Sequence, residues 1–150
     1  MNILALDVAT KTGWCCGDAS GVWDFKIKRD ESSGMRLVRF RSKLNEMIEL
    51  AKPELVVFER TSGFHKNALI VQAELHGLMK SVLEDRELDY RAYSAGEIKK
   101  HATGKGNAKK DAMIQSAKEK WPHKIIADDN EADACWLHDL AATDLVDVSR

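Results

Sequence analysis

The sequence of 150 residues predicts an α/β domain with a mixed five-stranded sheet, three antiparallel strands then two parallel ones, and helices on both faces. Three observations lead to this fold class. Two short apolar runs, at residues 2–8 and 55–59, have the composition of central strands buried on both sides. Other segments carry apolar residues at helical spacing, as crossover helices between parallel strands do. The length fits a single domain over residues 1–150, which can fold without disulfide or metal support.

The first three predicted strands form an antiparallel succession. Residues 2–8 are a near-continuous apolar run with one carboxylate near the end, which is typical of a central buried strand. A turn over residues 10–13 leads to a second short strand at 13–17. A hairpin turn at 18–21 then leads to a third strand at 22–28, whose side chains alternate between two faces. Because each turn reverses the chain, neighbouring strands here run antiparallel.

Two helices and two strands are predicted in the middle of the chain. Apolar residues at helical spacing indicate a helix over residues 37–51, and Pro53 marks its exit. Residues 55–59 form a short apolar strand that ends in a carboxylate. A polar loop leads to a helix over residues 67–83, and residues 90–93 form the last strand.

Three shorter segments complete the predicted order of elements. Ser94 is expected to cap a short helix that runs to residue 101, because its hydroxyl can accept a hydrogen bond from a free amide. A glycine-rich loop at 103–107 separates it from a helix over 109–121, which ends before a proline. The last helix is predicted to run from a cap at Asp129 or Asn130 to about residue 142.

The composition is that of a soluble globular protein, with 44% hydrophobic and 31% charged residues. No apolar run reaches the roughly 18 residues of a membrane span, and the amino terminus is too short and too acidic for a signal peptide. We therefore expect a cytoplasmic protein with no membrane partner. Three cysteines, Cys15, Cys16 and Cys135, lack the spacing of a zinc site and are predicted to be small buried hydrophobic residues.

Charge is strongly segregated along the chain, although the formal net charge is −1. Residues 26–43 carry seven basic and two acidic side chains, and residues 97–110 carry five basic and one acidic. Residues 127–149 carry seven acidic side chains and no lysine or arginine. Charge runs are usually solvated faces, but two basic segments and one carboxylate cluster also suit a polyanion held over metal ions.

Acidic side chains end both of the central strands. Asp7 follows one run of four apolar residues and Glu59 follows another. If the two strands are neighbours, these carboxylates repel each other unless a cation lies between them. Asp133 is predicted one turn into the last helix, where Asn130 and Asp129 share its face. Acidic residues in a first helical turn also simply complement the helix dipole, so the sequence alone leaves both interpretations of this segment open.

This set of side chains predicts a divalent metal site. Ligands that are all oxygen favour Mg²⁺, with Mn²⁺ as a substitute, over zinc. Two such ions about 4 Å apart can bind one phosphate, activate a water and stabilise the leaving oxygen of an in-line displacement. The chain has no G-x-S-x-G motif and no cysteine with a suitable histidine partner. Nucleophilic serine or cysteine chemistry is therefore not expected.

Four segments occur in an order and spacing that resemble a known family. They are LALDVATKTGW (4–14), VVFERTSGF (56–64), EIKKHATGKGNAKKDAM (97–113) and NEADACWL (130–137). Together they resemble the RuvC-type Holliday-junction resolvases of the RNase H-like superfamily, which are bacterial and phage-encoded, with the phage type as the expected match. The resemblance covers residues 1 to about 142. It implies an RNase H-like fold and an endonuclease that resolves four-way DNA junctions.

The resemblance also implies a set of metal ligands. Asp7, Glu59 and Asp133 match the family's first-strand, central-strand and last-helix carboxylates, and they are expected to be catalytic. The family has a D-x-x-D pattern on the last helix, and its first position is Asn130 here. An amide oxygen can still bind Mg²⁺, and Asp129 is one residue away. Either residue is expected to complete the metal site.

Basic and aromatic residues are expected to contact the DNA. Lys99 and Lys110 match the family's two basic residues beside the glycine-containing loop, and Lys110 is expected to act at the scissile phosphate. Lys105 and Lys109, in and beside the same loop, are also expected to bind DNA. The family commonly has an aromatic wedge three residues beyond the central glutamate. Phe64, two residues further along, is close enough to replace it.

A homodimer is implied as well, because the helix over 67–83 corresponds to the helix that builds the family's two-fold dimer. Beside its main apolar stripe this helix has a second, flatter face formed by Ile70, Ala73 and Gly77. Glycine inside a helix costs about 1 kcal/mol relative to alanine, which indicates that something approaches Gly77 closely. A symmetric dimer would present two identical active sites to two strands of a junction.

Three other functions are compatible with parts of the sequence. An RNase H-like nuclease could prefer other branched DNA or RNA, and a non-catalytic junction-binding protein could carry Asn130 as the mark of a decayed site. A strand ending in D-x-A-T-x-T-G also opens the ATPases of the actin, sugar-kinase and Hsp70 type. Those proteins need two lobes and a second phosphate loop, for which 150 residues leave no space. No nucleotide cofactor is therefore expected.

Overall fold

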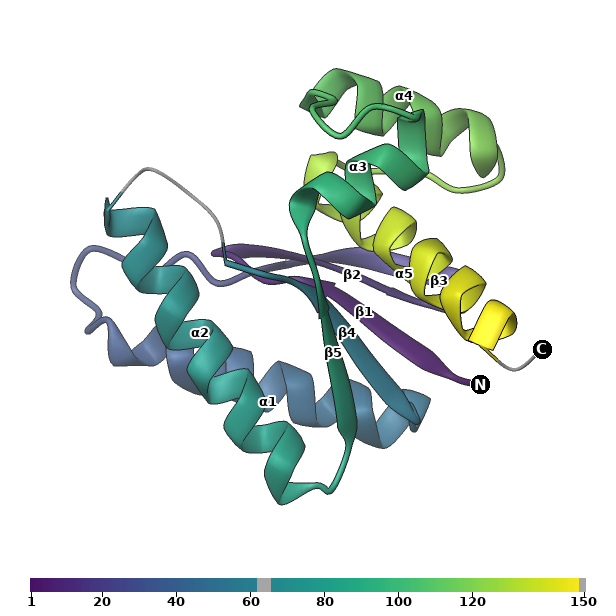
Figure 1. The fold of residues 1–150 in the computed structure, drawn as a ribbon. Helices are drawn as coiled ribbons and strands as arrows, with labels where there is room; N and C mark the ends of the chain where they lie inside the picture. Colours follow the sequence, from purple (N-terminus) through teal and green to yellow (C-terminus); the bar gives the residue numbers. More distant parts are fainter. Residues whose placement is uncertain (62–65, 149–150) are drawn as a thin grey trace.

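The computed structural model describes the backbone of residues 1–61 and 66–148, and side chains as far as residue 145. Its centre is a five-stranded sheet with the order β3-β2-β1-β4-β5 (Figure 1). The strands are β1 (Ile3–Asp7), β2 (Lys11–Cys16), β3 (Ala19–Asp24), β4 (Leu55–Glu59) and β5 (Asp89–Tyr93). The β1–β2 and β2–β3 pairs are antiparallel, whereas the β1–β4 and β4–β5 pairs are parallel. The predicted mixed sheet is confirmed.

Helices cover both faces of this sheet, as predicted. On one face lie α1 (Gly34–Ala51), which connects β3 to β4, and α2 (Lys66–Asp85), which connects β4 to β5 (Figure 1). On the other face lies α5 (Asp129–Val148), with α3 (Ala95–Thr103) and α4 (Lys110–Lys120) packed beside it. Each face buries its own apolar cluster, because the side chains of a strand point alternately to its two sides.

This alternation decides where the acidic side chains at the strand ends point. In β1 the even-numbered residues pack with α1 and α2, and the odd-numbered residues pack with α5. Asp7 is the next odd-numbered residue. In β4, Leu55 and Val57 pack on the α5 side, and Glu59 continues that series. Since β1 and β4 are paired neighbours, Asp7 and Glu59 leave the sheet side by side, on the face that α5 covers.

A glycine allows the start of α5 to approach the sheet next to Asp7. Gly13 of β2 pairs with Asp7 across the β1–β2 ladder. A Cβ atom on Gly13 would lie 1.9 Å from the carbonyl oxygen of Asn130 and 2.3 Å from its carbonyl carbon. No side chain fits at these distances. Glycine at this position therefore lets the first turn of α5 rest on the ladder beside Asp7.

The third strand differs from the one predicted at residues 22–28. β3 pairs with β2 earlier in the chain and ends at Asp24. It ends there because its partner β2 begins at Lys11, so that after one more hydrogen bond in the same register, from the amide of Phe25 to the carbonyl of Thr10 (2.8 Å), no strand remains to pair with. β2 likewise begins at Lys11, inside the predicted turn. The chain after β3 therefore leaves the sheet earlier and enters a longer loop.

The last helix differs at both ends. The prediction of a cap at Asp129 or Asn130 is wrong, because both residues lie inside α5. Asp128 is the capping residue, and its Oδ1 accepts a hydrogen bond from the amide of Glu131 (2.9 Å). The helix also continues to Val148, well past residue 142, since the sequence beyond 142 contains no glycine or proline that would end it.

The cysteines have the predicted packing role. Cys15 and Cys135 are buried, Cys16 is half-buried, and all three are free thiols. His138, three residues after Cys135, accepts a hydrogen bond from the amide of Gly17 (3.3 Å).

In the part of the chain that the structure describes, no helix is both long and apolar enough to cross a lipid bilayer.

Candidate active site

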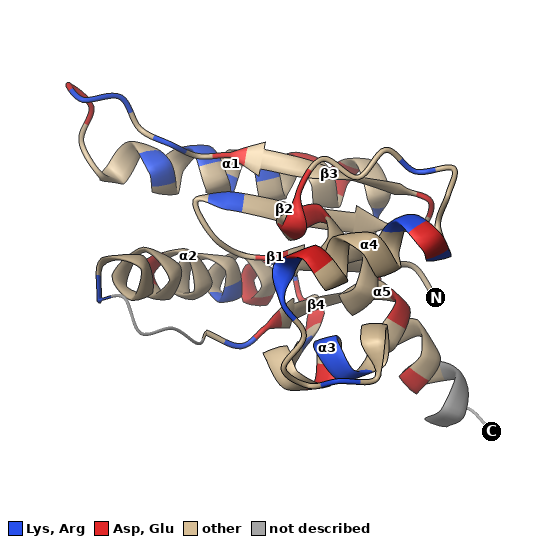
Figure 2. Cartoon of the chain, turned by 90° about the horizontal axis from the view of Figure 1, so that it is seen from above, with Lys and Arg blue, Asp and Glu red and all other residues tan. Residues whose placement is uncertain are grey.

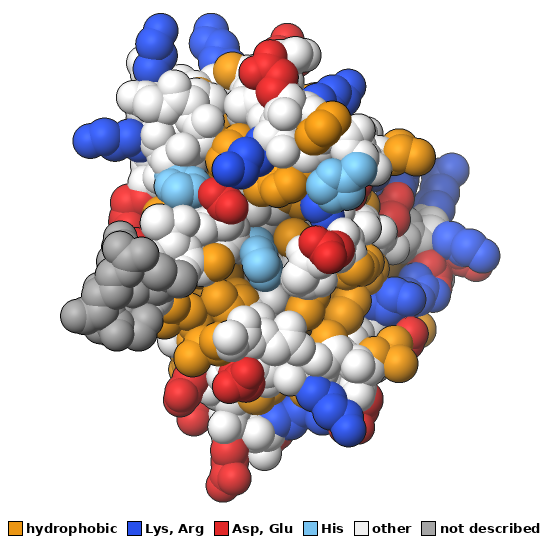
Figure 3. Space-filling model, turned by 90° about the vertical axis from the view of Figure 1, so that its right-hand side faces the viewer, with side chains coloured by type: hydrophobic (Ala, Val, Ile, Leu, Met, Phe, Trp, Pro, Cys, Tyr) orange, Lys and Arg blue, Asp and Glu red, His pale blue; other side chains and the backbone are white. Residues whose placement is uncertain are grey.

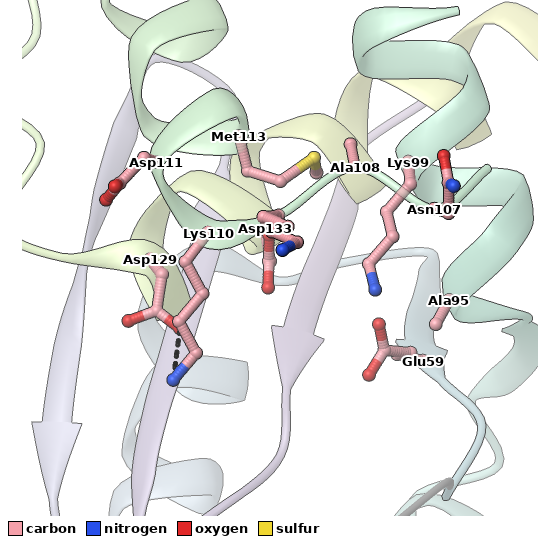
Figure 4. A pocket seen from close by; sticks show the side chains of 11 residues that line it. Glu59, Ala95, Lys99, Asn107, Ala108, Lys110, Asp111, Met113, Asp129 and Asp133 are labelled. Carbon is pink, nitrogen blue, oxygen red and sulfur yellow. Dashed lines mark ion pairs between the residues drawn. The ribbon is translucent and has the colours of Figure 1, made fainter. Parts of the chain in front are cut away.

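A cavity of about 660 Å³ opens at the edge of the sheet where β4 ends and α5 begins (Figure 4). The other parts of its wall come from α3, the loop before α4 and the first turn of α4. It is lined by Glu59, Ala95, Lys99, Asn107, Ala108, Lys109, Lys110, Asp111, Met113, Asp129 and Asp133. In sheets with crossover helices, ligands bind outside the carboxyl ends of the strands, which is where this cavity lies.

Carboxylates from three elements meet at this edge. Glu59 comes from β4, and Asp129 and Asp133 come from consecutive turns of α5. Asp7, at the end of β1, does not line the cavity but lies within electrostatic reach of all three. Burial raises the pKa of Asp7 well above its usual range, and the charges of Glu59, Asp133 and Asp129 raise it further. The fold therefore brings together the three carboxylates predicted as catalytic.

The electrostatics of the cluster show an excess of negative charge. Burial, and then the charges of Glu59 and Asp129, raise the pKa of Asp133 from its ordinary value of 3.8 to about 7. Lys99 and Lys110 act in the opposite direction on Asp133. Burial also raises the pKa of Glu59, which Lys99 partly offsets. Clustered carboxylates whose pKa values are raised by burial and mutual repulsion are typical of a site that binds a cation.

The available ligands fit a hard divalent cation. All of them are carboxylate oxygens, which Mg²⁺ and Mn²⁺ prefer. Among the residues that the structure describes, no three acidic, histidine or cysteine side chains lie close enough together to hold one ion by themselves. Mg²⁺ usually takes one or two carboxylates and completes its shell with water and substrate phosphate. The residues therefore fit a site completed by the substrate, not a closed protein cage.

Three of the four lysines predicted to bind DNA line the same cavity. They are Lys99, Lys109 and Lys110. The ammonium group of Lys99 points toward Glu59, and the Nζ of Lys110 lies 3.8 Å from the Oδ2 of Asp129 (Figure 4). Lys105, the fourth, is exposed in the loop between α3 and α4, outside the cavity lining.

Local hydrogen bonds fix the segment that carries these lysines. Ser94 caps α3 in a capping box, as predicted. The helix ends at Gly104, whose left-handed conformation (φ 83°) favours glycine. The hydroxyl of Thr103 donates to the carbonyl of Lys99 (3.0 Å) and accepts from the amide of Lys105 (3.2 Å). The loop is therefore closed against the end of α3 and holds the start of α4 at the cavity.

Asn130 does not share the cavity of Asp129 and Asp133. It belongs to a neighbouring cavity of about 340 Å³, between the β1–β2 turn and the start of α2, lined by Ala9, Thr10, Lys11, Asn67, Ala68, Val71, Gln72 and Asn130. Its Nδ2 donates a hydrogen bond to the Oδ2 of Asp128 (3.3 Å). Consecutive residues point about 100° apart on a helix, so Asp129 and Asn130 leave α5 on different sides. The expected common face therefore holds only for Asp129 and Asp133.

Two curated proteins named crossover junction endodeoxyribonuclease RuvC are similar to the chain, although no family model matches it. The protein from Brachyspira hyodysenteriae is 32% identical over 108 residues, which are 71% of this chain and 66% of the relative. The protein from Prochlorococcus marinus is 29% identical over 91 residues, which are 61% of this chain and 56% of the relative. In both cases the chain covers less than two thirds of the relative's length.

Solved structures match almost the whole fold. Thermus thermophilus RuvC in complex with a Holliday junction substrate has a TM-score of 0.74 and 18% identity, over 91% of this chain and 90% of that chain. The yeast mitochondrial Holliday junction resolvase Ydc2 has a TM-score of 0.63 and 14% identity, over 90% of this chain and 75% of that chain. The chain is therefore similar to members of the RuvC family both in sequence and in fold. It has the RNase H-like fold of that family, as the resemblance implied.

Two residues that sequence reasoning missed hold α5 in place. Glu131 is only 3% exposed, and it accepts hydrogen bonds from the hydroxyl of Ser20 (2.6 Å) and the amide of Ala127 (2.8 Å). Asp128 caps the helix. The pattern Asp128-x-x-Glu131 is a capping-box signature that the sequence already contained. The bond to Ser20 had no such signal, because it joins residues 111 positions apart.

One of the two departures from the RuvC pattern cannot be placed. Phe64, the expected replacement for the family's aromatic wedge, lies outside the described residues, so its role stays a prediction. The other departure, Asn130, is placed clearly. It lies in the neighbouring cavity and Asp129 in the main one, which favours Asp129 as the residue that completes the carboxylate cluster.

The separation of these two residues leads to a prediction about the metal requirement. We expect Asp129→Ala to raise the Mg²⁺ concentration for half-maximal cleavage of a four-way junction by roughly tenfold, because a carboxylate leaves the cavity. Asn130→Ala should change it less than about twofold. Mg²⁺ titrations of cleavage measure both, with Asn130→Asp as the third variant. The opposite ranking, together with a lower requirement in Asn130→Asp, would assign the ligand to Asn130.

Proposed function

We propose that the chain is a structure-selective endonuclease that resolves four-way (Holliday) DNA junctions by paired, metal-dependent phosphodiester hydrolysis. The observation that carries the proposal is the meeting of Asp7, Glu59 and Asp133 at one sheet edge, opposite Lys99 and Lys110. The names of the curated relatives and the junction bound to a similar structure support the choice of substrate.

Asp7, Glu59, Asp129 and Asp133 are the residues that would hold Mg²⁺, or Mn²⁺ in its place. A bound divalent ion supplies polarisation of the scissile phosphate and activation of a water for in-line attack. The chain supplies rigid placement, since its carboxylates stand on β1, β4 and α5 instead of on free loops. Their partial burial also makes electrostatic interactions stronger there than in bulk water.

The lysines of the cavity act on the phosphate. Lys99 and Lys110 face the carboxylates from the opposite wall, where their charges would offset the negative charge that develops on the phosphoryl oxygens. Lys109 and the exposed Lys105 would hold phosphates further along the backbone. Such contacts raise affinity and fix orientation but carry no sequence information.

Cleavage of a labelled synthetic four-way junction, with and without Mg²⁺, tests the proposal. We expect paired nicks in strands of like polarity, dependent on Mg²⁺ and absent from a linear duplex. Preferential cutting of Y-shaped DNA or RNA would instead indicate an RNase H-like nuclease of other specificity. Binding without cutting in either Mg²⁺ or Mn²⁺ would indicate an inactive junction-binding protein. We propose the cytoplasm of a bacterium or a phage-infected host as the protein's location.

We also propose that two copies pair through the exposed side of α2. That side presents Leu69 and Ile70, which are 40% and 48% exposed, near Ala73 and Gly77. A Cβ atom on Gly77 would meet no atom within 4 Å, so packing inside the described chain does not require glycine there. Close approach of a second helix accounts for its presence. A two-fold dimer presents identical active sites to two strands of like polarity.

Gly77→Arg is expected to dissociate this dimer while the monomer remains folded. The arginine side chain has room in the monomer, and helix propensity improves by up to about 1 kcal/mol when glycine is replaced. Sedimentation velocity should give twice the chain mass of 16.8 kDa for the wild type and a single chain mass for the variant. Gly77→Ala, which adds one methyl group, should weaken the dimer less. A dimer that tolerates Gly77→Arg would place the interface elsewhere.

Protons and the metal should compete for the carboxylates. Asp133 has a pKa of about 7 in the folded protein, above its ordinary 3.8, so it stabilises the fold at low pH and this stabilisation is lost as the pH rises through 7. Without metal, we expect Tm to fall between about pH 4 and pH 7, and Mg²⁺ to restore it mainly at the higher pH. Thermal unfolding measures this, with Asp133→Asn as the control that should flatten the profile. If Mg²⁺ does not change the Tm at about pH 8, the result would contradict the metal site.

A further inference from the structure

We propose that a second basic surface, on the far side of the carboxylates from α3 and α4, binds a duplex arm of the branched DNA. We call it the β3–α1 surface and define it by Lys26, Lys28 and Arg29 in the loop after β3 and Lys43 on α1. The inference rests on the proposed function, because it extends the DNA surface past the candidate active site.

The loop that carries this surface starts at the same edge of the sheet as the active site. β1 and β3 both pair antiparallel with β2, so they run in the same direction and end at the same edge. Asp24, the last residue of β3, pairs with Lys11 at the start of β2. The amide of Phe25 then donates a hydrogen bond to the carbonyl of Thr10 (2.8 Å), in the turn that follows Asp7. The loop therefore leaves the sheet beside the catalytic carboxylates.

The cations of the loop face solvent. Lys26, Lys28 and Arg29 are exposed and form no ion pair within the described part of the chain. Glu31, which follows them, is held by Arg39 through both guanidinium nitrogens, and it also accepts a hydrogen bond from the amide of Lys28 (2.7 Å). These contacts lower the pKa of Glu31 to about 2. Of the two acidic residues in the loop, Glu31 is therefore already neutralised from α1. Three exposed cations remain against the single carboxylate of Asp30, so the loop keeps a net positive charge for a polyanion.

A groove of about 530 Å³ continues the surface along the edge strand β3. It lies between β3 and α1 and is lined by Trp14, Gly21, Val22, Trp23, Asp24, Phe25, Arg39 and Lys43. It shares Phe25 with the start of the loop, and Lys43 lies exposed on its α1 side, in a solvent-exposed ion pair with Glu46 (4.0 Å) that a phosphate can replace. The loop and the groove thus form one basic path that leads away from the active-site edge.

The distribution of charge sets this edge apart from the rest of the molecule. Lysines and arginines lie on the loop after β3 and on α1 on one side of β1, and on α3 and the start of α4 on the other (Figure 2). At the opposite end, charges of both signs are interspersed with hydrophobic side chains (Figure 3). A four-way junction has arms on each side of its crossover. One arm would meet α3 and α4, and its neighbour would meet the β3–α1 surface.

Two triple variants test this surface, each removing three positive charges. The loop variant is Lys26→Ala, Lys28→Ala and Arg29→Ala, and the matched control is Lys52→Ala, Lys118→Ala and Lys120→Ala. All six side chains are exposed, so both variants should keep the wild-type circular dichroism spectrum and Tm. The affinity for a four-way junction is measured without metal at several salt concentrations. The single-turnover cleavage rate is measured in Mg²⁺ with saturating protein.

The loop variant is expected to bind the junction about tenfold less tightly, with a slope of log K against log salt that is shallower by roughly 2 to 3. Its cleavage rate at saturation should stay within about twofold of the wild type, because these residues lie outside the cavity. The control variant should match the wild type in affinity and slope. Equal losses in both variants, or none in the loop variant, would overturn the inference.

A series of junctions with shortened arms tests the assignment to a DNA arm. The loss of affinity in the loop variant, relative to the wild type, should vanish as the arms are shortened, because the surface then has no DNA to bind. A deficit that does not depend on arm length would overturn the assignment. Failure of the proposed function is recognised separately. A wild-type protein that neither prefers nor cuts four-way DNA refutes that function, while salt slopes on a linear duplex still decide whether the loop binds phosphates.

Discussion

Replacing Asp7 by Asn is expected to abolish cleavage of four-way DNA, by a factor on the order of 10³ or more, while the protein still binds the junction. The substitution keeps the size of the side chain and removes the charge that would bind the metal. The negative charges of four other acidic groups act on Asp7, because Glu59, Asp133, Asp129 and Asp128 all raise its pKa. Losing one of several repelling negative charges should also raise Tm in the absence of metal.

Binding should remain because the basic residues that face DNA are unchanged in this variant. Affinity is expected to stay equal or to increase slightly, as one negative charge near the phosphates is gone. The control is Asp111→Asn, an acidic residue that lines the same cavity but is not among the charges that raise the pKa of Asp7. It should cut the junction at close to the wild-type rate. Wild-type cleavage by Asp7→Asn would refute the metal assignment.

The second large effect is expected from Gly13→Ala, although one methyl group in a strand is normally harmless or slightly stabilising. The new Cβ would meet main-chain atoms of Asn130 and Glu131, the nearest at 1.9 Å, and main chain cannot swing aside as a side chain can. The first turn of α5 must therefore move away from the sheet. Overpacking of this kind costs about 1–3 kcal/mol or more, which lowers Tm by roughly 3–10 °C in a domain of this size.

The displaced turn carries Asp129 and has Asp133 one turn later, so the variant should also lose cleavage activity at temperatures where it remains folded. Circular dichroism and cleavage at about 15 °C below its Tm separate the two effects. Gly34→Ala is the matched control, because a Cβ on Gly34, at the start of α1, meets nothing within 4 Å. It should be neutral or stabilising by up to about 1 kcal/mol. Normal stability and activity in Gly13→Ala would show that α5 is not seated as described.

Sequence reasoning found the sheet and its acidic edge because both depend on local patterns. An apolar run that ends in a carboxylate identifies a buried strand and its exit, and the period of two in strands fixes which face the last residue occupies. Local pattern is therefore enough to pair Asp7 with Glu59. The strand neighbours followed from the order of turns and crossover helices.

The start of α5 was harder to predict than the sheet. An error of one residue in the position of the helix cap changes the direction in which each side chain leaves the helix by about 100°. Asp128, Asp129 and Asn130 are all good capping residues by type. The hydrogen bond between Asp128 and Glu131 decides among them, and Glu131 is fixed in turn by Ser20 on a distant strand. With the cap at Asp128, Asp129 faces the main cavity and Asn130 the neighbouring one.

The end of β3 was mispredicted for a similar reason. Phe25 is buried and continues the apolar alternation of the strand, so the sequence pattern gives no sign that pairing stops at Asp24. The stop comes from the loss of main-chain partners, because β2 begins at Lys11 and the residues before it form the turn from β1. Main-chain partners of this kind leave no trace in side-chain periodicity.

The division of the apolar interior into two clusters has a consequence for how the sequence can vary over time. Tyr93 and Trp136 belong to the cluster under α5, whereas four buried aromatic residues, Trp23, Phe25, Phe40 and Phe58, belong to the cluster between the sheet and the α1–α2 pair. The main chain of the sheet separates this cluster from the carboxylates on the α5 side. Substitutions among the apolar residues on the α1–α2 side should therefore be limited only by their effect on folding stability. On the α5 side, a substitution of equal size also shifts the helix that carries Asp129 and Asp133. Substitutions there should therefore be limited by loss of activity as well.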